Sequence, residues 1–595
     1  MRTGSTYSTG LGSTAGRLYC VPDKLLTRGA REYNLKIWLP DYLGRVWARP
    51  FFEHVLLLCA VLFAGLLFVR PLSAFTTDEG AGILQARQVQ DGWKWRIASP
   101  PPELDPTGEA SLLMRSDDGS RGRAFYSKHP LYPVLLAGVD ALGKRPGLFF
   151  LSIFGTASSS VVAALIARRL RPDLDRATLW ITGLASPLFF YAYVVVGHSL
   201  LAALTGLVVL LALGAGRMKG TVRAGLLFLC CAIAAALRTE GAFVGPALAV
   251  GLLASGWLES RSIASRARPA LTVMAGAVTG AVLDRLAARA VIGDPLPTES
   301  GNPDGFFASR WDGLIHSWFS GSMDGIPSDV LLVGATSLLI VAAVLAARPA
   351  KSGMASALVS AAAALYVTRT VADQFTIIPG LVLTAPVGVV GLVALRSRWR
   401  QSEDTRVLVL TSLFFVAAVA LTQYAGGGGL EWGGRYFSAV LPLLSPLVVL
   451  ALAHLLPALG RWRFVTVAAL TVGTACMSVT SLSILNRAHM ITTELEQLAE
   501  NVTRDHPNAV MVWTQPLFPQ VVWDGVDVER WLIPPEGGLA ATVERLKKAG
   551  VEEAVLVSGS EVIERPLFEG TFPVVEARRA RHTPEVFLIG RARAQ

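Results

Sequence analysis

The chain has 595 residues, of which 52% are hydrophobic and 16% charged, and its formal net charge is +10. Soluble domains usually carry about 25% charged residues. This composition therefore excludes a soluble globular protein and predicts a polytopic α-helical membrane protein. The excess of Lys and Arg is spread among short loops, which agrees with a cytoplasmic bias of basic residues and excludes nucleic acid as a partner.

The first part of the chain, residues 1–50, is predicted to be a cytosolic N-terminal segment. Residues 1–49 contain eight Lys or Arg against three acidic residues, and they lack the charged-then-apolar pattern of a signal peptide. The five cysteines have no metal-ligand spacing, so the sequence indicates neither a zinc site nor a disulfide framework.

Thirteen apolar runs follow, and together they predict a transmembrane domain over residues 51–485. A run of about 20 apolar residues is long enough to cross a bilayer as a helix. The runs lie near 52–73, 146–167, 177–196, 199–216, 222–237, 241–257, 269–291, 328–347, 353–369, 376–395, 407–424, 436–456 and 463–484.

The basic residues of the short loops predict the orientation of these helices. If the N-terminus is cytosolic, eighteen Lys or Arg fall in the cytoplasmic loops and four in the outer loops, leaving aside the long first loop. The four are Arg238, Arg310, Arg369 and Arg435. We therefore expect an integral plasma (inner) membrane protein whose first loop, residues 74–145, and last segment, residues 486–595, both lie on the extracytoplasmic side.

The first outer loop opens with the acidic pair Asp78 and Glu79, which follows the first apolar run directly. Carboxylates at a membrane boundary are costly unless they stay hydrated or paired, so the pair is either a solvated helix end or part of a site. Ile83, Leu84 and Ala86 after it could form one face of a short helix on the membrane. The apolar segment around residues 125–136 predicts a second interfacial helix.

The last segment, residues 486–595, changes composition and predicts a small α/β domain. Strands are expected at 510–514, 553–558, 572–577 and 585–588, and a helix at 539–549.

Polar residues at the outer ends of the predicted helices are few and combine acids with cations. They are Asp78, Glu79, Lys128, His129, His198, Arg238, Glu240, Arg369, Asp373, Glu431 and Arg435. Cations beside a carboxylate at a membrane surface suit an anionic, lipid-linked substrate, since Arg and Lys bind phosphate oxygens. A phosphate leaves without a general acid when cations stabilise it, while an acceptor hydroxyl needs a carboxylate to orient it or take its proton.

Three short motifs resemble the GT-C glycosyltransferases, nearest the branch of the aminoarabinose transferase and the protein O-mannosyltransferase-like enzymes. They are TDE at 77–79, YSKHPLY at 126–132 and GRYF at 434–437. The resemblance implies a GT-C-like fold and an inverting transfer from a polyprenyl-phosphate sugar to a hydroxyl on a glycan, lipid or protein. Asp78 would be the catalytic carboxylate with Glu79 in support, and Lys128 would contact the lipid phosphate with Arg435 and Arg238. The expected substrate-binding residues are Tyr126, His129, Tyr132, His198, Glu240, Glu431 and Tyr436.

Other interpretations stay open at this stage. Lys128 and Arg435 could anchor lipid headgroups, the two histidines could be structural, and Arg238 could pair only with Glu240. No cofactor is required, although Glu431 and Asp294 are candidate ligands of a divalent metal. The alternative function is a transporter or flippase of a lipid-linked saccharide, which would place ionisable residues at mid-membrane. Ala-, Arg- and Gly-rich usage indicates a high-GC bacterium, for which arabinose or mannose would be natural donor sugars.

Overall fold

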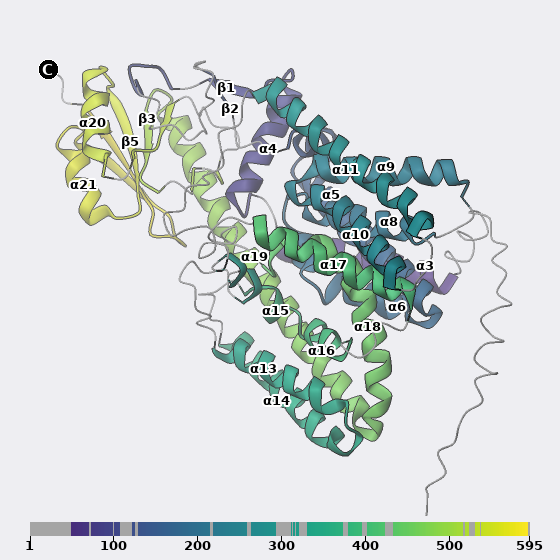
Figure 1. Ribbon diagram of the computed structural model, residues 1–595. Helices are drawn as coiled ribbons and strands as arrows, with labels where there is room; N and C mark the ends of the chain where they lie inside the picture. The colour runs from purple at the N-terminus through teal and green to yellow at the C-terminus, as the bar shows by residue number, and fades with distance from the viewer. Residues whose placement is uncertain are drawn as a thin grey trace, which may run out of the picture.

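A computed structural model gives the fold of the chain (Figure 1). It describes residues 49–70, 73–98, 100–106, 122–124, 129–214, 218–258, 263–292, 311, 313–315, 317–319, 330–372, 379–395, 402–422, 432–515, 518–519, 521–522, 530–535 and 537–592. Within these residues a helical bundle is joined to a small domain that contains a β-sheet.

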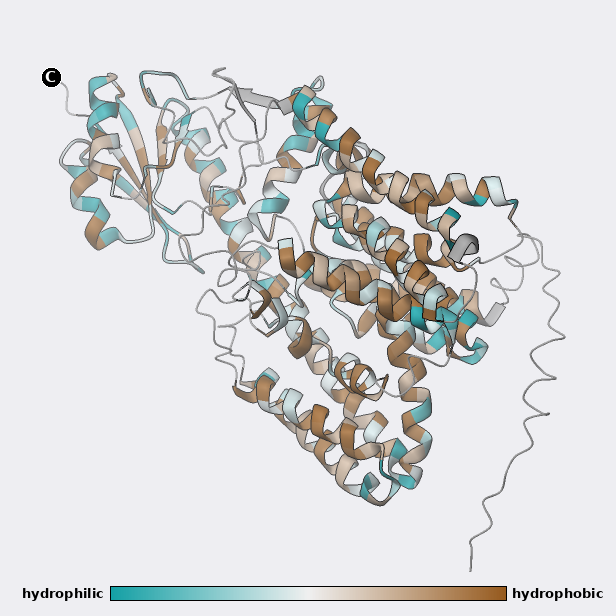
Figure 2. Cartoon of the chain, viewed as in Figure 1, coloured by the Kyte–Doolittle hydropathy of each residue, from teal (hydrophilic) through white to brown (hydrophobic). Residues whose placement is uncertain are grey.

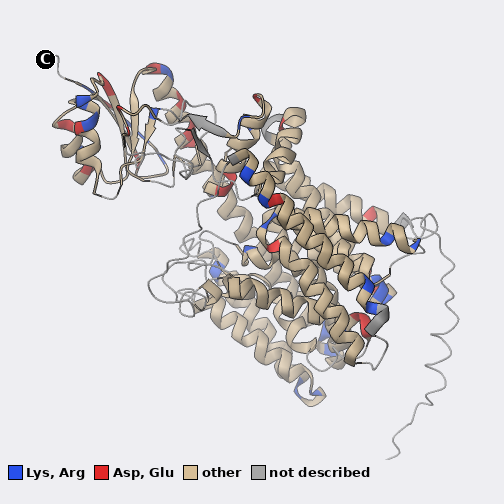
Figure 3. Ribbon diagram, turned by 45° about the horizontal axis from the view of Figure 1, so that its top comes forward, with Lys and Arg blue, Asp and Glu red and all other residues tan. Residues whose placement is uncertain are grey.

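The bundle confirms the predicted class of an integral, mostly helical membrane protein. Nine helices in the described part of the chain are long and apolar enough to cross a membrane. Figure 2 shows brown, hydrophobic residues along the bundle, and Figure 3 shows that most Lys, Arg, Asp and Glu lie at the helix ends or in the C-terminal part. The main helices of the bundle are α3 (Arg49–Val69), α5 (Leu131–Leu170), α8 (His198–Ala212), α9 (Gly220–Leu237), α10 (Val244–Leu258), α11 (Ile263–Ile292), α13 (Val330–Ala346), α14 (Ser352–Val371), α17 (Glu403–Thr422), α18 (Leu441–Ala458) and α19 (Arg463–Asp505). Of these, α8 and α13 are shorter than the nine candidate spans.

Each predicted apolar run overlaps a helix, but two runs are interrupted, and the count of thirteen spans stays a prediction. The run 177–196 forms α6 (Asp175–Leu184) and α7 (Leu188–Tyr191), and the run 376–395 forms α15 (Leu381–Thr384) and α16 (Pro386–Leu395). Both breaks come just before a proline, Pro187 or Pro386. Proline disfavours the helical conformation of the residue before it, which explains the interruptions.

Two helices extend beyond the predicted runs. The predicted interfacial segment is described from His129 on, and from Leu131 it forms the start of α5, which continues past Pro146 to Leu170. Helix α19 begins at Arg463 and runs without a break to Asp505. Beyond residue 484 it is amphipathic rather than apolar, with buried residues such as Leu485, Leu495 and Val502, so hydropathy alone did not show its true end.

Helix α4 (Thr77–Gln90) lies between the bundle and the C-terminal domain (Figure 1). The sequence predicted one apolar face formed by Ile83, Leu84 and Ala86. Instead, Ile83 and Ala86 pack into a core cluster of the bundle, whereas Leu84 and Ala81 pack into the cluster that contains the sheet. The helix therefore has two apolar sides, and it connects the two parts of the molecule.

The C-terminal domain is a five-stranded sheet with two helices. Its strand order is β4-β3-β5-β7-β6; β3 pairs in parallel with β4 and β5, and β7 pairs antiparallel with β5 and β6. All four predicted strands and the predicted helix have counterparts, and β4 and α21 are additional. The elements are β3 (Val510–Trp513), β4 (Trp531–Leu532), α20 (Leu539–Lys548), β5 (Glu553–Ser558), α21 (Glu561–Glu569), β6 (Val574–Arg579) and β7 (Val586–Arg591).

The remaining described elements are short. The strands β1 (Arg96–Ala98) and β2 (Gly122–Ala124) form an antiparallel pair. Five 3-10 helices connect the longer elements: η1 (Pro172–Leu174), η2 (Thr239–Phe243), η3 (Pro349–Lys351), η4 (Arg435–Val440) and η5 (Gly460–Trp462). Of these, η2 and η4 carry predicted site residues.

Candidate active site

The acidic pair lies in the first turn of α4, where a capping box fixes the backbone. The hydroxyl oxygen of Thr76 accepts a hydrogen bond from the backbone N–H of Glu79 at 3.3 Å. In return, Oε2 of Glu79 accepts from the N–H groups of Phe75 at 2.6 Å and Thr76 at 2.8 Å. This reciprocal arrangement satisfies N–H groups that a helix start leaves without intrahelical partners.

Glu79 is fully buried, and its carboxylate also accepts a hydrogen bond from the backbone N–H of Val195. Burial, with a smaller contribution from the neighbouring charge of Asp78, raises the pKa of Glu79 to about 7 against the opposing effect of the three backbone hydrogen bonds. Asp78, one residue earlier in the turn, keeps 23% of its side chain exposed. The two acids are therefore in different environments, and Asp78 is the more accessible one.

Asp78 forms an ion pair with Arg435, whose Nη1 lies 2.9 Å from Asp78 Oδ2. Arg435 begins η4, and only 9% of its side chain is exposed. Its Nη2 also donates to the hydroxyl of Tyr436 at 3.2 Å. A charge-assisted hydrogen bond of this length holds both groups in a defined orientation.

Two glycines before Arg435 make this arrangement possible. Gly433 and Gly434 have φ values of +65° and +63°, a conformation that side chains rarely adopt. A Cβ atom on Gly434 would lie 2.6 Å from the backbone oxygen of Ser317, and one on Gly433 would lie 2.4 Å from Cγ of Pro187. Both positions are therefore closely approached by other groups, which leaves room only for glycine.

Arg238 and Glu240 form a second ion pair at the start of η2. Arg238 Nη2 lies 3.2 Å from Glu240 Oε1, and Nε lies 3.3 Å from Oε2, so the pair uses both carboxylate oxygens. The two residues do pair with each other, but this is not their only interaction. The 3-10 helix η2, which Arg238 precedes, also packs against η4, which Arg435 begins, so the two guanidinium groups come from neighbouring elements.

His198 begins α8 beside these cations and is 1% exposed. Its ring lies 5.4 Å from that of Tyr191 and 6.4 Å from that of Tyr436, measured between centroids. Among the described residues neither ring nitrogen has a hydrogen-bond partner. A buried polar group without a partner is costly, so His198 indicates a place where a polar ligand would complete the site.

Tyr132 is buried near the start of α5 and borders the same region. A Cβ atom on Gly197, the residue before His198, would lie 3.4 Å from Cδ2 of Tyr132 and 3.6 Å from Cδ of Arg238. Tyr132 and Arg238 therefore both lie next to the backbone of Gly197.

His129 contacts protein groups through both ring nitrogens. Nδ1 lies 2.9 Å from Oδ2 of Asp284 on α11, and Nε2 lies 3.0 Å from the hydroxyl of Thr239, next to Arg238. Neither Asp284 nor Thr239 was among the residues predicted from the sequence. The single acid inside the apolar run 269–291 was the signal that could have identified Asp284, because such residues are costly unless paired.

The structure thus brings eight predicted site residues together from five segments. They are Asp78 and Glu79 from α4, Tyr132 from α5, His198 from α8, Arg238 and Glu240 from the α9–α10 connection, and Arg435 and Tyr436 from η4. Tyr126, Lys128 and Glu431 lie outside the described residues, as do Asp294 and Asp373. In the part of the chain that the structure describes, no group of three or more His, Cys, Asp or Glu side chains is placed to hold a metal ion.

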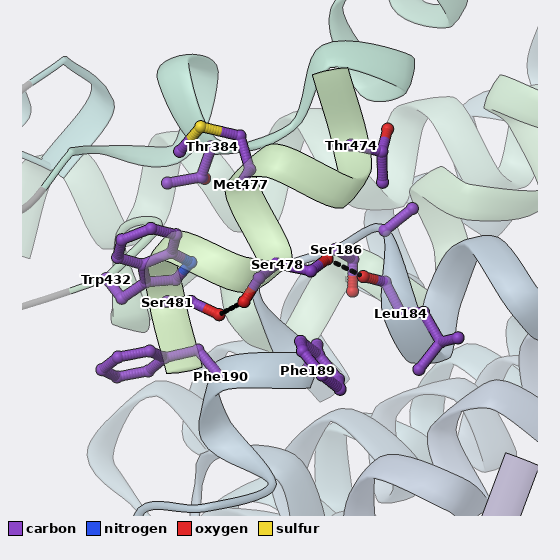
Figure 4. Close-up of a pocket in the computed structure, with 11 residues that line it drawn as sticks. Leu184, Ser186, Phe189, Phe190, Thr384, Trp432, Thr474, Met477, Ser478 and Ser481 are labelled. Carbon is purple, nitrogen blue, oxygen red and sulfur yellow. Dashed lines mark hydrogen bonds between the residues drawn. The ribbon is translucent and has the colours of Figure 1, made fainter. Parts of the chain in front are cut away.

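A small pocket lies near this region, but none of the predicted site residues lines it (Figure 4). Its aromatic wall is Trp432 stacked on Phe190, with centroids 5.4 Å apart. The hydroxyl of Ser478 donates to the backbone oxygen of Leu184, and that of Ser481 to the backbone oxygen of Ser478. The pocket is linked to the candidate site by Tyr191, whose hydroxyl donates to the backbone oxygen of Trp432 at 2.6 Å.

No protein-family model and no curated protein matches the sequence. Among solved structures, the chain is similar to ArnT from Cupriavidus metallidurans, crystallised in the apo state and bound to undecaprenyl phosphate. For each ArnT structure the TM-score is 0.49 and the identity 12%, covering 90% of this chain and 97% of that chain.

The chain is also similar to the oligosaccharyltransferase of Archaeoglobus fulgidus, crystallised with a tethered acceptor peptide that contains the NVT sequon. That match has a TM-score of 0.45 and 11% identity, and covers 93% of this chain and 75% of that chain. These are likenesses of overall fold.

Proposed function

We propose that the protein is an inverting glycosyltransferase that moves a sugar from a polyprenyl-phosphate donor to an acceptor hydroxyl on a glycan, lipid or protein. The observation that carries this proposal is the ion pair between Asp78 and Arg435, with the charge of Arg238 close by. One accessible carboxylate beside two guanidinium groups provides what the transfer needs, namely a proton acceptor and a cationic site for the departing phosphate.

In this mechanism the donor phosphate binds to Arg435 and Arg238. Arg435 then divides its hydrogen bonds between the phosphate and Asp78, and Asp78 accepts the proton of the acceptor hydroxyl. The acceptor oxygen attacks the anomeric carbon from the side opposite the phosphate, which inverts the configuration. The bond between that carbon and the phosphate oxygen breaks, its electron pair stays on the phosphate, and the two cations stabilise the added charge.

The other site residues have supporting roles in this proposal. His198 has two ring nitrogens without partners among the described residues, so it is suited to hydrogen bonds with donor hydroxyls. Tyr132 and Tyr436 border the same space, and Glu240 keeps Arg238 in place. The motif resemblance adds Lys128 as a third phosphate contact and Tyr126, His129 and Glu431 as substrate contacts. For His129 the observed bonds to Asp284 and Thr239 favour a positioning role instead.

We also propose that the site faces the extracytoplasmic side of the plasma membrane. The support is the excess of basic residues in the loops at the opposite ends of the helices. Position on this side would give the enzyme access to lipid-linked donors and to acceptors of the cell envelope.

The direct test is transfer from a radiolabelled polyprenyl-phosphate sugar by the purified full-length protein. We expect Asp78→Asn and Arg435→Ala to lower the rate at least 100-fold. Asp91→Asn is the matched control, because Asp91 is an exposed acid at the other end of the same helix. Rates near the parent level in both site variants would contradict the proposal. Mass spectrometry of co-purifying lipids would identify the donor sugar.

A further inference from the structure

We infer that Glu79 does not contact substrate but is a positioning residue, which ties the helix that carries Asp78 to the connection between α7 and α8. This inference rests on the proposed function, because it concerns the orientation of Asp78 during the transfer. It assigns the second acid of the pair a role different from catalytic support.

The first argument is the environment of the Glu79 carboxylate. Its side chain has no exposed surface, and its two oxygens accept three backbone N–H groups, from Phe75, Thr76 and Val195. Two of these donors belong to the corner before α4, and the third lies 116 residues away in the chain. A group in this position has no open face toward a substrate, whereas it joins two segments directly.

The second argument is what the α7–α8 connection carries. Helix α7 ends at Tyr191. Three residues then lead to Val195, and α8 begins at His198. Gly197 lies next to Tyr132 and Arg238, since a Cβ atom there would be in van der Waals contact with both, and the hydroxyl of Tyr191 donates to the backbone oxygen of Trp432, three residues before Arg435. A shift of this connection would therefore move the residues on the phosphate side of the site relative to Asp78.

The third argument is that the corner before α4 is already fixed on its opposite side. The hydroxyl of Ser73 is hydrogen-bonded to the backbone oxygen of His489 at 3.2 Å and to the hydroxyl of Thr493 at 3.0 Å, both on α19. Phe75 packs edge-on against Phe190 of α7, with centroids 5.6 Å apart. Glu79 adds the hydrogen bond that sets the register between α4 and the backbone leading into α8.

Only a carboxylate can make all three bonds. A glutamine at position 79 has one acceptor oxygen and one NH2 group. If the oxygen accepts from Phe75 and Thr76, the NH2 group faces the N–H of Val195, and because both are donors no hydrogen bond forms there. Glu79→Gln should therefore release the α7–α8 connection while keeping the helix cap. Glu79→Asp keeps the charge, but its side chain is one methylene shorter and cannot serve both segments.

The experiment compares full-length Glu79→Gln, Glu79→Asp and Asp78→Asn with the parent, using Glu103→Gln, an exposed acid, as the control. We expect Glu79→Gln to lower kcat at least 10-fold and Glu79→Asp at least threefold. The KM for the donor should stay within threefold of the parent, as should the affinity for undecaprenyl phosphate measured by native mass spectrometry. Thermal unfolding identifies any variant that does not fold, and Glu79→Asp is the milder change if Glu79→Gln fails.

The outcomes separate this inference from the proposed function. If Asp78→Asn transfers at the parent rate, the proposed function is wrong. If Asp78→Asn is inactive while both Glu79 variants keep the parent kcat, only the positioning role is wrong. A more than 10-fold rise in donor KM with unchanged kcat would show a substrate contact and would likewise overturn it.

Discussion

Asp78 and Arg435 lie 357 residues apart in the chain, and their side chains meet in an ion pair of 2.9 Å. One comes from the first turn of α4 and the other from the start of η4, after two glycines in the left-handed region. The pair stabilises both charges where the surroundings are largely buried. It also places a proton acceptor and a phosphate-binding cation next to each other, which is the relationship on which the proposed chemistry depends.

The first prediction concerns the cation of this pair. Arg435→Ala should weaken binding of undecaprenyl phosphate about 10- to 100-fold, because a hydrogen bond between charged groups contributes about 1.5–3 kcal/mol. Arg435→Lys should restore only part of the affinity, since the ammonium group lacks the two-pronged geometry. Native mass spectrometry of the full-length protein measures both variants. Arg504→Ala, at an exposed position on α19, is the control, and equal affinities for it and for Arg435→Ala would exclude Arg435 from phosphate binding.

A second prediction follows from the pKa of Glu79, which burial raises from 4.5 to about 7. Between these two values the folded protein binds more protons than the unfolded chain, so this group contributes stability that is full below pH 4.5 and is lost as the pH rises through about 7. A pKa difference of this size corresponds to a contribution of about 3 kcal/mol to the free energy of unfolding.

The measurement is thermal unfolding of the parent and of Glu79→Gln between pH 4.5 and 8. The Tm of the parent relative to the variant should rise as the pH falls, because glutamine does not titrate. Two other ionisable groups interact with Glu79, namely Asp78 and Tyr132; burial raises the pKa of Tyr132 out of this range. Asp78→Asn is therefore included, and a Tm difference that is flat with pH would contradict the prediction.

The third prediction concerns the backbone before Arg435. Gly434→Ala should lower both the Tm and the transfer rate, because the new Cβ would combine a strained φ with a contact of 2.6 Å to the oxygen of Ser317. Gly537 is a matched control, since its φ is +71° but a Cβ there meets no atom within 4 Å. Gly537→Ala should therefore lower the free energy of unfolding only by the cost of the backbone strain, about 1 kcal/mol. Equal Tm losses in the two variants would show that the close approach at Gly434 has no energetic weight.

The sequence predicted the class of the fold and most of the charged residues of the site, because both depend on composition. A long apolar run predicts a membrane helix, and Asp78, Arg238 and Arg435 stand out where charges are scarce. It did not predict the breaks before Pro187 and Pro386, because hydropathy averages over a proline. It also missed the double role of α4, whose second apolar side packs against a domain that is more than 400 residues further along the chain.

Other features could not be read from the sequence because they depend on backbone groups that every residue carries. The N–H of Val195 binds Glu79, but nothing in the side chain of a valine indicates this. Likewise, the partners of His129 become apparent only when α11 and η2 are brought beside the start of α5. Side-chain type indicates which residues are costly to bury, whereas the tertiary fold decides which groups satisfy them.

The fourth prediction concerns the chain of hydrogen bonds from Asp284 through His129 to Thr239. Because Thr239 adjoins Arg238, we expect this chain to orient the cation rather than to contact substrate. His129→Ala and Asp284→Asn should each lower kcat about 3- to 30-fold, with a smaller effect than Asp78→Asn. The double variant should be no slower than the slower single variant, since residues that act through one network show non-additive effects.

The measurement is a double-mutant cycle on the transfer rate, with Asp140→Asn on α5 as a control that leaves this chain intact. Fully multiplicative losses would show that His129 and Asp284 act independently, and an unchanged rate in both single variants would remove the chain from the site.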